Sequence, residues 1–389
     1  MSRALADHPE VLYGFAVALV IVILLTPAVG GMARLLGVVD QPGGRRINMR
    51  PIPRLGGLAI LLGIFVPALA FLDLGRDTRG VLVGAAIAAT VGAVDDFRGL
   101  PPWAKLGGQV LAAGTAAWFG VWVDNFTFPF LGSQELSAWV GVPLTILWIV
   151  AIMNMVNFLD GLDGLAAGVC AISGVTFSVI ALSLGKPDPA ILAAIVAGAC
   201  IGFLRHNFYP ARIFMGDSGA LLLGFVLAAL AVQGLLKTAA TVGLLFPLLV
   251  LAVPILDTSF VVARRLKNRE KVYAADQGHL HHRFLRRGFS ETRAALTMWG
   301  WCATLAGAAL ATRFVPFSRH GDWHLWWTVL AAAIGLVAVA ASLYVVYVLE
   351  RRLGAQRAVL PGAGHAVQRL GEPFNLLLDA FVRSASGTS

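Results

Sequence analysis

The feature that most constrains this chain is a succession of apolar runs, most of them close to 20 residues long. One helical crossing of a bilayer takes about 20 apolar residues. The runs cover residues 11–32, 55–73, 80–94, 104–123, 138–153, 164–184, 189–204, 219–234, 239–262, 292–312 and 324–348. The run 80–94 is short, so it has to tilt or end at the interface. We therefore predict an all-α polytopic membrane protein with about eleven transmembrane helices.

Composition excludes other classes of protein. Of the 389 residues, 58% are hydrophobic and 13% are charged, against about 45–50% and 25% in soluble domains. A soluble globular domain, a disordered chain and a nucleic-acid-binding module are excluded on these values. Cys170, Cys200 and Cys302 all lie inside apolar runs, which favours small core residues over disulfides or zinc. The first apolar run lacks a clear cleavage site, so no cleavable signal peptide is predicted.

The Lys and Arg residues set the predicted orientation. One set of loops, with the C-terminal tail, carries 23 of the 30 basic residues, and the opposite set carries 7. Because basic loops face the cytoplasm, we place the N-terminus outside. The predicted organisation is a single membrane domain, 1–349, followed by a cytoplasmic tail, 350–389. The tail is expected to be solvated, with contact to anionic membrane lipid as the alternative.

Unusual polar segments lie only in the loops predicted to be cytoplasmic. Residues 40–57 carry four arginines among Gly and Pro, including Arg46 and Arg54. Arginine side chains bind phosphate oxygens well, although a plain topology signal is the alternative. Asp95 and Asp96 end the third run. Carboxylates at a membrane boundary are costly unless paired, hydrated or metal-bound, and oxygen ligands suit Mg²⁺ or Mn²⁺. Pairing with Arg98 or Lys105 is the alternative.

Two further segments add acids, amides and an aromatic ring. Asn157, Asp160 and Asp163 are spaced three apart, and helical residues at that spacing are neighbours. The alternative is a polar turn between spans. Residues 205–219 then place Asn207, Phe214 and Asp217 just before a span. Phe214 can stack on a base and Asp217 can bind a metal, while helix capping by Asp217 or Ser218 is the structural alternative.

The fifth segment is a histidine cluster in the longest of these loops. Its residues are His279, His281, His282 and Arg283. Binding of phosphate charge is favoured over zinc, since no cysteine or obvious fourth ligand accompanies the histidines. A solvated loop is the remaining alternative. Asp257, just after Pro254 in the ninth run, is a further intramembrane acid. The sequence favours neither a structural role at a proline kink nor a functional role for it.

Together these segments supply an acidic metal centre, basic groups for phosphate and a ring for a base, all in a hydrocarbon environment. Phosphoryl transfer needs charge neutralisation and alignment more than covalent chemistry. The sequence therefore predicts transfer of a phosphoryl group from a soluble nucleotide to a lipid acceptor.

These segments, in their order over residues 40–300, resemble the polyprenyl-phosphate N-acetylhexosamine-1-phosphate transferase superfamily. The chain looks most similar to the undecaprenyl-phosphate GlcNAc-1-phosphate transferase branch, which starts O-antigen, enterobacterial-antigen and teichoic-acid linkage synthesis. The branch that uses UDP-MurNAc-pentapeptide typically has three consecutive histidines, whereas Leu280 interrupts the cluster here. A second departure is Asn48, where the family often has His. Any cationic role there has to pass to Arg46, Arg50 or Arg54.

The resemblance implies a reaction and residue roles. Undecaprenyl phosphate attacks the sugar-linked phosphorus of a UDP-HexNAc, UMP leaves, and a lipid-linked sugar remains in the bacterial inner membrane. Asp217 is implied as a Mg²⁺ ligand, with Mn²⁺ as a substitute, and Asp95 and Asp96 as contacts of metal or lipid phosphate. The nucleotide side is implied to include Asn157, Asp160, Asp163, Asn207 and Phe214. His279 and its cluster are implied to hold the diphosphate or the sugar.

Two other functions remain as alternatives at this point. A membrane ion or solute transporter would use the same acids, but it predicts acids deep in the spans and access from both faces. A CDP-alcohol phosphotransferase has a similar Asp-Gly pattern, yet its continued Asp-rich helix is not found. The identity of the HexNAc, the downstream polymer, the polyprenyl length, a general-base role for an Asp and the oligomeric state, a homodimer included, are left open.

Overall fold

The computed structural model describes residues 2–41, 51–128, 132–236, 245–269, 279–314, 318–319, 322–323 and 325–358. Arg46, Arg50, Asn48 and most of the C-terminal tail lie outside the described residues. By internal contacts the chain divides into Met1–Ala338 and Val339–Ser389. The described part of the second unit is the later half of one long helix. The predicted boundary between a membrane domain and a tail therefore stays a prediction.

Helices make up nearly all of the described chain. They are α1 (Ser2–Asp7), α2 (Glu10–Leu35), α3 (Gly56–Phe71), α4 (Arg76–Arg98), α5 (Pro102–Trp118), α6 (Ala138–Leu159), α7 (Leu165–Ser183), α8 (Pro187–Asn207), α9 (Gly216–Leu230), a π-helix (Ala231–Leu236), α10 (Leu245–Val250), α11 (Ala252–Lys267), α12 (Leu280–Arg286), α13 (Glu291–Phe314) and α14 (Leu325–Ala358). The run 80–94 belongs to a helix of 23 residues, so it is not short.

Within the described ranges, three antiparallel pairs of short strands interrupt the helices. They are β1 (Val39–Asp40) with β2 (Ile52–Pro53), β3 (Asn125–Phe128) with β4 (Gly132–Glu135), and β5 (Ser318–Arg319) with β6 (Asp322–Trp323). The prediction of an all-helical chain omitted them because such short strands leave little sequence signal. The first hairpin matters for the site, because pairing of Asp40 with Ile52 brings Asp40 close to Arg54.

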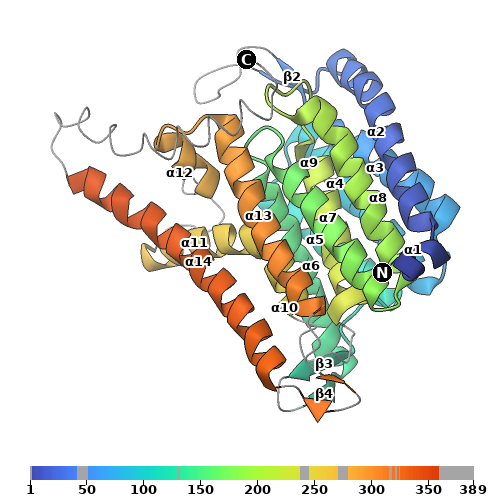
Figure 1. Ribbon diagram of the computed structural model, residues 1–389. Helices are drawn as coiled ribbons and strands as arrows, with labels where there is room; N and C mark the ends of the chain where they lie inside the picture. The colour runs from blue at the N-terminus through green and yellow to red at the C-terminus, as the bar shows by residue number, and fades with distance from the viewer. Residues whose placement is uncertain are drawn as a thin grey trace, which may run out of the picture. The chain divides into compact units, whose positions relative to one another are not determined.

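The structure agrees with the prediction of a helical, multi-pass membrane protein. Eight of the described helices are long and apolar enough to cross a membrane, namely α2, α4, α6, α7, α8, α9 with the start of the π-helix, α13 and α14. The shorter helix α3 is also apolar. The predicted total of about eleven spans, and their orientation, stay predictions. Helices α7, α8 and α9 form the buried centre of the first unit, with α2, α3, α4 and α6 packed around them (Figure 1).

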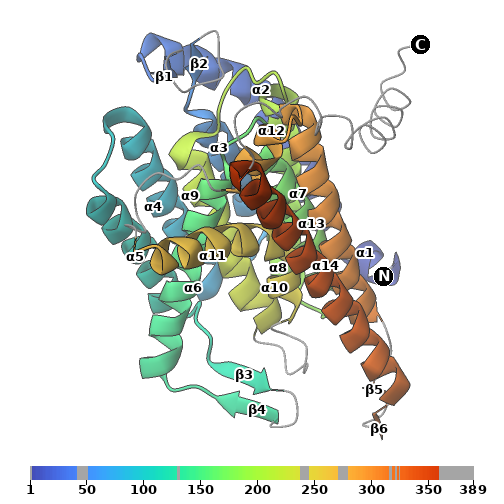
Figure 2. The same ribbon diagram turned by 90° about the vertical axis from the view of Figure 1, so that its left-hand side faces the viewer.

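The predicted span 239–262 is divided in the structure. Helix α10 ends at Val250, and α11 then runs across the bundle axis in both views (Figure 2). Pro254 explains the break, because proline has no N–H to donate to the carbonyl four residues earlier. That carbonyl belongs to Val250, and it accepts the hydroxyl of Ser173 at 3.4 Å instead. The break directs Asp257, on α11, toward the interior, where it is 2% exposed.

Candidate active site

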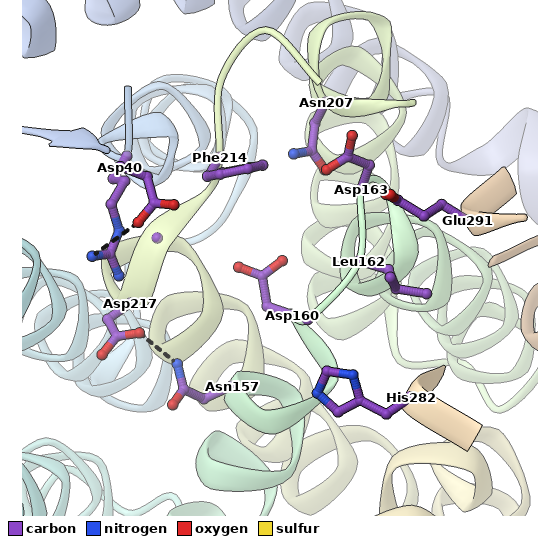
Figure 3. A pocket seen from close by; sticks show the side chains of 13 residues that line it. Asp40, Asn157, Asp160, Leu162, Asp163, Asn207, Phe214, Asp217, His282 and Glu291 are labelled. Carbon is purple, nitrogen blue, oxygen red and sulfur yellow. Dashed lines mark hydrogen bonds and ion pairs between the residues drawn. The ribbon is translucent and has the colours of Figure 1, made fainter. Parts of the chain in front are cut away.

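A cavity of about 290 Å³ lies where α6, α9 and α13 meet the hairpin of β1 and β2. Figure 3 shows carboxylate, amide, aromatic and imidazole side chains that line it. Its lining residues are Asp40, Arg54, Asn157, Asp160, Gly161, Leu162, Asp163, Asn207, Phe214, Gly216, Asp217, His282 and Glu291. Residues from four of the five predicted polar segments therefore share this cavity, together with residues that the sequence did not single out.

Asp217 stands in the first turn of α9, and Asp96 holds that turn in place. The two carboxylate oxygens of Asp96 accept the backbone N–H groups of Asp217 at 2.9 Å and Ser218 at 3.0 Å. The Asp96 side chain is fully buried and does not line the cavity. The turn itself needs Gly216, whose φ of +67° is in the left-handed region that favours glycine. Asp96 thus fixes the start of α9, and the contact with metal or lipid phosphate predicted for Asp95 and Asp96 stays a prediction.

Lys105 joins the two other acids of the predicted centre. Its Nζ lies 2.9 Å from Asp95 Oδ2 and also bonds Asp217 Oδ2. Asn157 donates to the other Asp217 oxygen at 2.8 Å. The alternative pairing of Asp95 with Lys105 is therefore present; neither residue lines the cavity, and Lys105 connects the pair to it through Asp217. Lys105 was not predicted as a site residue. A lysine at the start of an apolar run is costly in the membrane, and this cost is the sequence signal that could have identified Lys105.

The second acidic segment forms a turn, not a continuous helix. Helix α6 ends at Leu159, so Asp160 and Asp163 are not helical neighbours as their spacing suggested. Asp160 points into the cavity (Figure 3). Burial, with the negative charges of Asp217 and Asp96, raises the pKa of Asp160 to about 8, despite the opposing effect of Arg54. Unless a metal ion binds beside it, this carboxyl is mostly protonated at neutral pH.

Asp163 and Asn207 fix the far wall of the cavity. Asp163 accepts the backbone N–H of Ala211 at 2.8 Å, and burial raises the pKa of this carboxyl. Asn207 accepts the N–H of Gly164 at 3.1 Å and donates to the carbonyl of Ile213 at 2.9 Å. These bonds tie the turn after α6 to the loop before α9. Asn207 therefore has a structural task as well as a place in the cavity wall.

Phe214 and Arg54 stand on two backbone segments that are bonded together. The N–H of Phe214 donates to Pro53 at 2.8 Å, and its carbonyl accepts from Gly56 at 2.9 Å. The Phe214 ring points into the cavity (Figure 3). The Arg54 guanidinium lies 3.8 Å from Asp96 and 3.9 Å from Asp40. One flat aromatic face and one cation thus border the acidic wall.

The histidine cluster is divided between the cavity and the interior. His282 lines the cavity. His279, His281 and Arg283 are 7%, 2% and 1% exposed. Arg283 lies with its guanidinium carbon 4.4 Å from the centre of the Phe260 ring. Burial, with the neighbouring His282 and His279, lowers the pKa of His281, so this ring is neutral at pH 7. Of these four residues, His282 is the one that lines the cavity, and the phosphate contacts of the cluster stay a prediction.

The charge of the cavity matters for any ligand. Among the described residues that line it, five carry carboxyl groups and one carries a guanidinium, namely Asp40, Asp160, Asp163, Asp217 and Glu291 against Arg54. Among the residues that the structure describes, no three His, Cys, Asp or Glu side chains are grouped closely enough to hold a metal ion alone. Mg²⁺ is usually held by one or two carboxylates with substrate phosphates and water. The donor set fits that manner of binding.

Asp40 and Glu291 are cavity residues that sequence reasoning missed. In the sequence Asp40 is only the first residue of the arginine loop, and the hairpin that places it is too short to predict. Glu291 begins α13, and Figure 3 shows its carboxyl group beside Asp163. A single acid at a helix start has a common structural use, since it is favourable there, so Glu291 carried no separate signal.

The fold and the cavity together define a helical, multi-pass membrane protein with a polar site at one end of its helices. Residues 78–235 match the family model for glycosyl transferase family 4. A probable undecaprenyl-phosphate N-acetylglucosaminyl 1-phosphate transferase of Bacillus subtilis is 39% identical over 292 residues, which are 75% of this chain and 81% of that protein.

Two other relatives extend the comparison. A decaprenyl-phosphate N-acetylglucosaminephosphotransferase of Mycobacterium leprae is 33% identical and covers 86% of this chain and 89% of its own. A phospho-N-acetylmuramoyl-pentapeptide-transferase of Desulforudis audaxviator is 34% identical over 69% of this chain and 86% of its own. The chain therefore belongs to the polyprenyl-phosphate N-acetylhexosamine-1-phosphate transferase superfamily, and it is a transferase.

Proposed function

We propose that the protein transfers a HexNAc-1-phosphate, GlcNAc-1-phosphate first among the candidates, from a UDP-sugar to undecaprenyl phosphate. The products are UMP and a lipid-linked sugar that starts a cell-envelope glycan at the bacterial inner membrane. The observation that carries the proposal is the junction of Asp95, Lys105, Asp217 and Asn157 at the edge of an acidic cavity. The names of the relatives from Bacillus subtilis and Mycobacterium leprae support GlcNAc.

The chemistry is a substitution at the sugar-linked phosphorus. An oxygen of the lipid phosphate forms the new P–O bond, and the bond from that phosphorus to the bridging oxygen breaks. UMP leaves with the electron pair. A phosphate monoester has a second pKa of about 6, so the attacking oxygen is largely ionised at neutral pH. The reaction therefore does not require a general base, and the site mainly has to align two anions that repel each other.

The residues of the cavity divide this task. Phe214 offers a ring for the uracil, and Asp163 and Asn207 shape the wall beside it. Arg54 and His282 border the phosphates from the cavity side. Lys105 keeps Asp217 and Asp95 together, and Asp96 fixes the backbone of Asp217. Arg46 remains a predicted phosphate contact outside the described residues.

A divalent cation, Mg²⁺ or Mn²⁺, fits this donor set. Asp217 would hold it, Asp95 shares Lys105 with Asp217, Asp160 lines the same cavity, and substrate phosphates would complete the ligands. When bound, the ion supplies positive charge that neutralises the diphosphate. The full burial of Asp96, and its two backbone bonds, favour a supporting role for this residue over direct ligation. Membership of a transferase family favours this function over a transporter.

The test uses the full chain purified into lipid nanodiscs. The assay supplies undecaprenyl phosphate, Mg²⁺ and a panel of UDP-HexNAc donors labelled in the sugar, and it measures UMP and labelled lipid. We expect equal amounts of both products from one donor, dependence on added lipid phosphate, and loss on chelation of the metal. Asp217→Asn should lower the rate at least tenfold, while Gly114→Ala, at a position with open space, serves as the control. The proposal is wrong if no UDP-HexNAc yields UMP.

A further inference from the structure

Asp257 is a buried carboxylate that none of the proposed steps uses. It lies on α11, three residues after the proline that redirects this helix, and it is 2% exposed. A buried carboxylate is costly unless hydrogen bonds satisfy both oxygens. Both are satisfied here. Oδ2 lies 2.9 Å from Nδ1 of His279, and Oδ1 accepts the backbone N–H of Leu280 at 2.7 Å.

These two bonds meet the beginning of α12. His279 is the residue before the helix, and Leu280 is its first residue. The N–H groups at a helix start have no partner within the helix, so a carboxylate from another helix supplies one. The α11 carboxylate therefore fixes both the backbone at the start of α12 and the ring that precedes it.

The bond to Nδ1 also sets the tautomer of His279. An ionised carboxylate only accepts hydrogen bonds, so Nδ1 has to carry the proton. In the neutral ring, Nε2 is then left with its lone pair. The ring is held further by Phe158, with centroids 5.5 Å apart, and by His281, stacked at 5.8 Å with 7° between the ring planes.

The contact continues from His279 to the cavity. The rings of His281 and His282 are 4.3 Å apart, and His282 lines the cavity. His281 lies against Gly161, where an added Cβ would be 2.7 Å from the imidazole Cε1. Gly161 follows Asp160 in the cavity wall. Ring contacts therefore link the start of α12 to His282 in the cavity wall.

We propose that Asp257 is a positioning residue, which fixes the Nδ1–H tautomer of His279 and the start of α12 and thereby holds His282 in the cavity. Its effect on turnover rests on the proposed function, whereas its effect on the tautomer does not. Carboxylates that orient metal-ligating histidines in this way typically contribute 10- to 100-fold to metal affinity or activity, and we expect an effect of the same order on kcat here.

The first experiment reads the tautomer and needs no substrate. The full chain, labelled with ¹⁵N in its eight histidines, is studied in lipid by solid-state NMR, and the His279 signals are assigned by their loss in His279→Gln. We expect His279 in the Nδ1–H form in the wild type. In Asp257→Asn the amide can donate to Nδ1, so the proton should move to Nε2. An Nε2–H form in the wild type would overturn the proposal.

The second experiment reads turnover with a matched control on the same helix. Asp257→Asn should lower kcat 10- to 100-fold and change KM less than threefold, and Asp257→Glu should restore part of kcat. Thr258→Val should keep wild-type kcat. Thr258 is also buried, and its hydroxyl has no hydrogen-bond partner within the described residues.

A double-mutant cycle separates positioning from general packing. If Asp257 acts through His279, adding Asp257→Asn to His279→Gln should lower kcat no further. A full additional loss would contradict the proposal. If the wild type shows no transfer from any donor, the proposed function fails, but the NMR result still decides whether Asp257 sets the tautomer.

Discussion

Replacing Gly92 by alanine tests how closely Asp217 has to be placed. Gly92 lies on α4, where this helix crosses the first turn of α9. A Cβ at Gly92 would lie 2.5 Å from the Cα of Ser218 and closer still to the carbonyl group of Asp217. Ordinary carbon contacts are about 3.5 Å or more, so the start of α9 has to move by roughly 1 Å. The atoms in the way belong to the backbone, so no side chain can turn aside to make room.

The expected cost of Gly92→Ala appears in both stability and turnover. Overpacking of this kind typically costs about 1–3 kcal/mol, which should appear as a lower melting temperature. A misplacement of about 1 Å can lower turnover about 100-fold, so kcat should fall by that order with the donor and lipid saturating. Gly114→Ala on α5 meets nothing within 4 Å and should keep both values. The reasoning is refuted if folded Gly92→Ala turns over within threefold of wild type.

Three further substitutions test separate parts of the cavity. Lys105→Ala leaves Asp217 without its ammonium partner, so kcat should fall at least tenfold, and Lys105→Arg should recover part of it. Equal rates for the wild type and both variants would contradict a role of Lys105 in placing Asp217. Phe214→Leu removes a stacking face worth about 1–3 kcal/mol per base, so the KM for the UDP-sugar should rise about 5- to 160-fold with little change in kcat, measured by initial rates. Asp160 has a pKa raised to about 8 from about 4, so the folded protein holds this proton more tightly than the unfolded chain, and ligand-free stability should fall as pH rises from 4 to 8. Asp160→Asn should reduce that fall, seen as a smaller difference in melting temperature between pH 5 and pH 8, and an unchanged difference would refute the assignment.

The metal proposal connects with the same group. A cation in the cavity favours the ionised form of Asp160, so Mg²⁺ with a nucleotide should remove part of the pH dependence of stability. The Asp160→Asn variant should then gain less from Mg²⁺ than the wild type does, at pH 8, in a thermal-shift measurement. An equal gain would place the cation away from this carboxyl.

Much of the site could be predicted from the sequence because its residues occur where polar groups are expensive. Asp95, Asp96, Asn157, Asp160 and Asp217 stand at the ends of apolar runs, and a membrane protein keeps such groups only where they have partners or a task. The helices themselves follow from the apolar runs, since each backbone polar group in hydrocarbon has to be satisfied within its own segment. Which of these groups would touch one another was beyond the sequence.

Only the tertiary structure decided the partners. Lys105 lies 112 residues before Asp217 in the chain, and Asp257 is 22 residues from His279; no periodic pattern connects either pair. The break at Leu251 turns Asp257 inward, and the short hairpin brings Asp40 to Arg54. Apolar patterning is local and therefore determines the class of fold and the ends of the helices. The distribution of charge over the cavity depends on which helices pack together, and that packing is settled by contacts between distant segments.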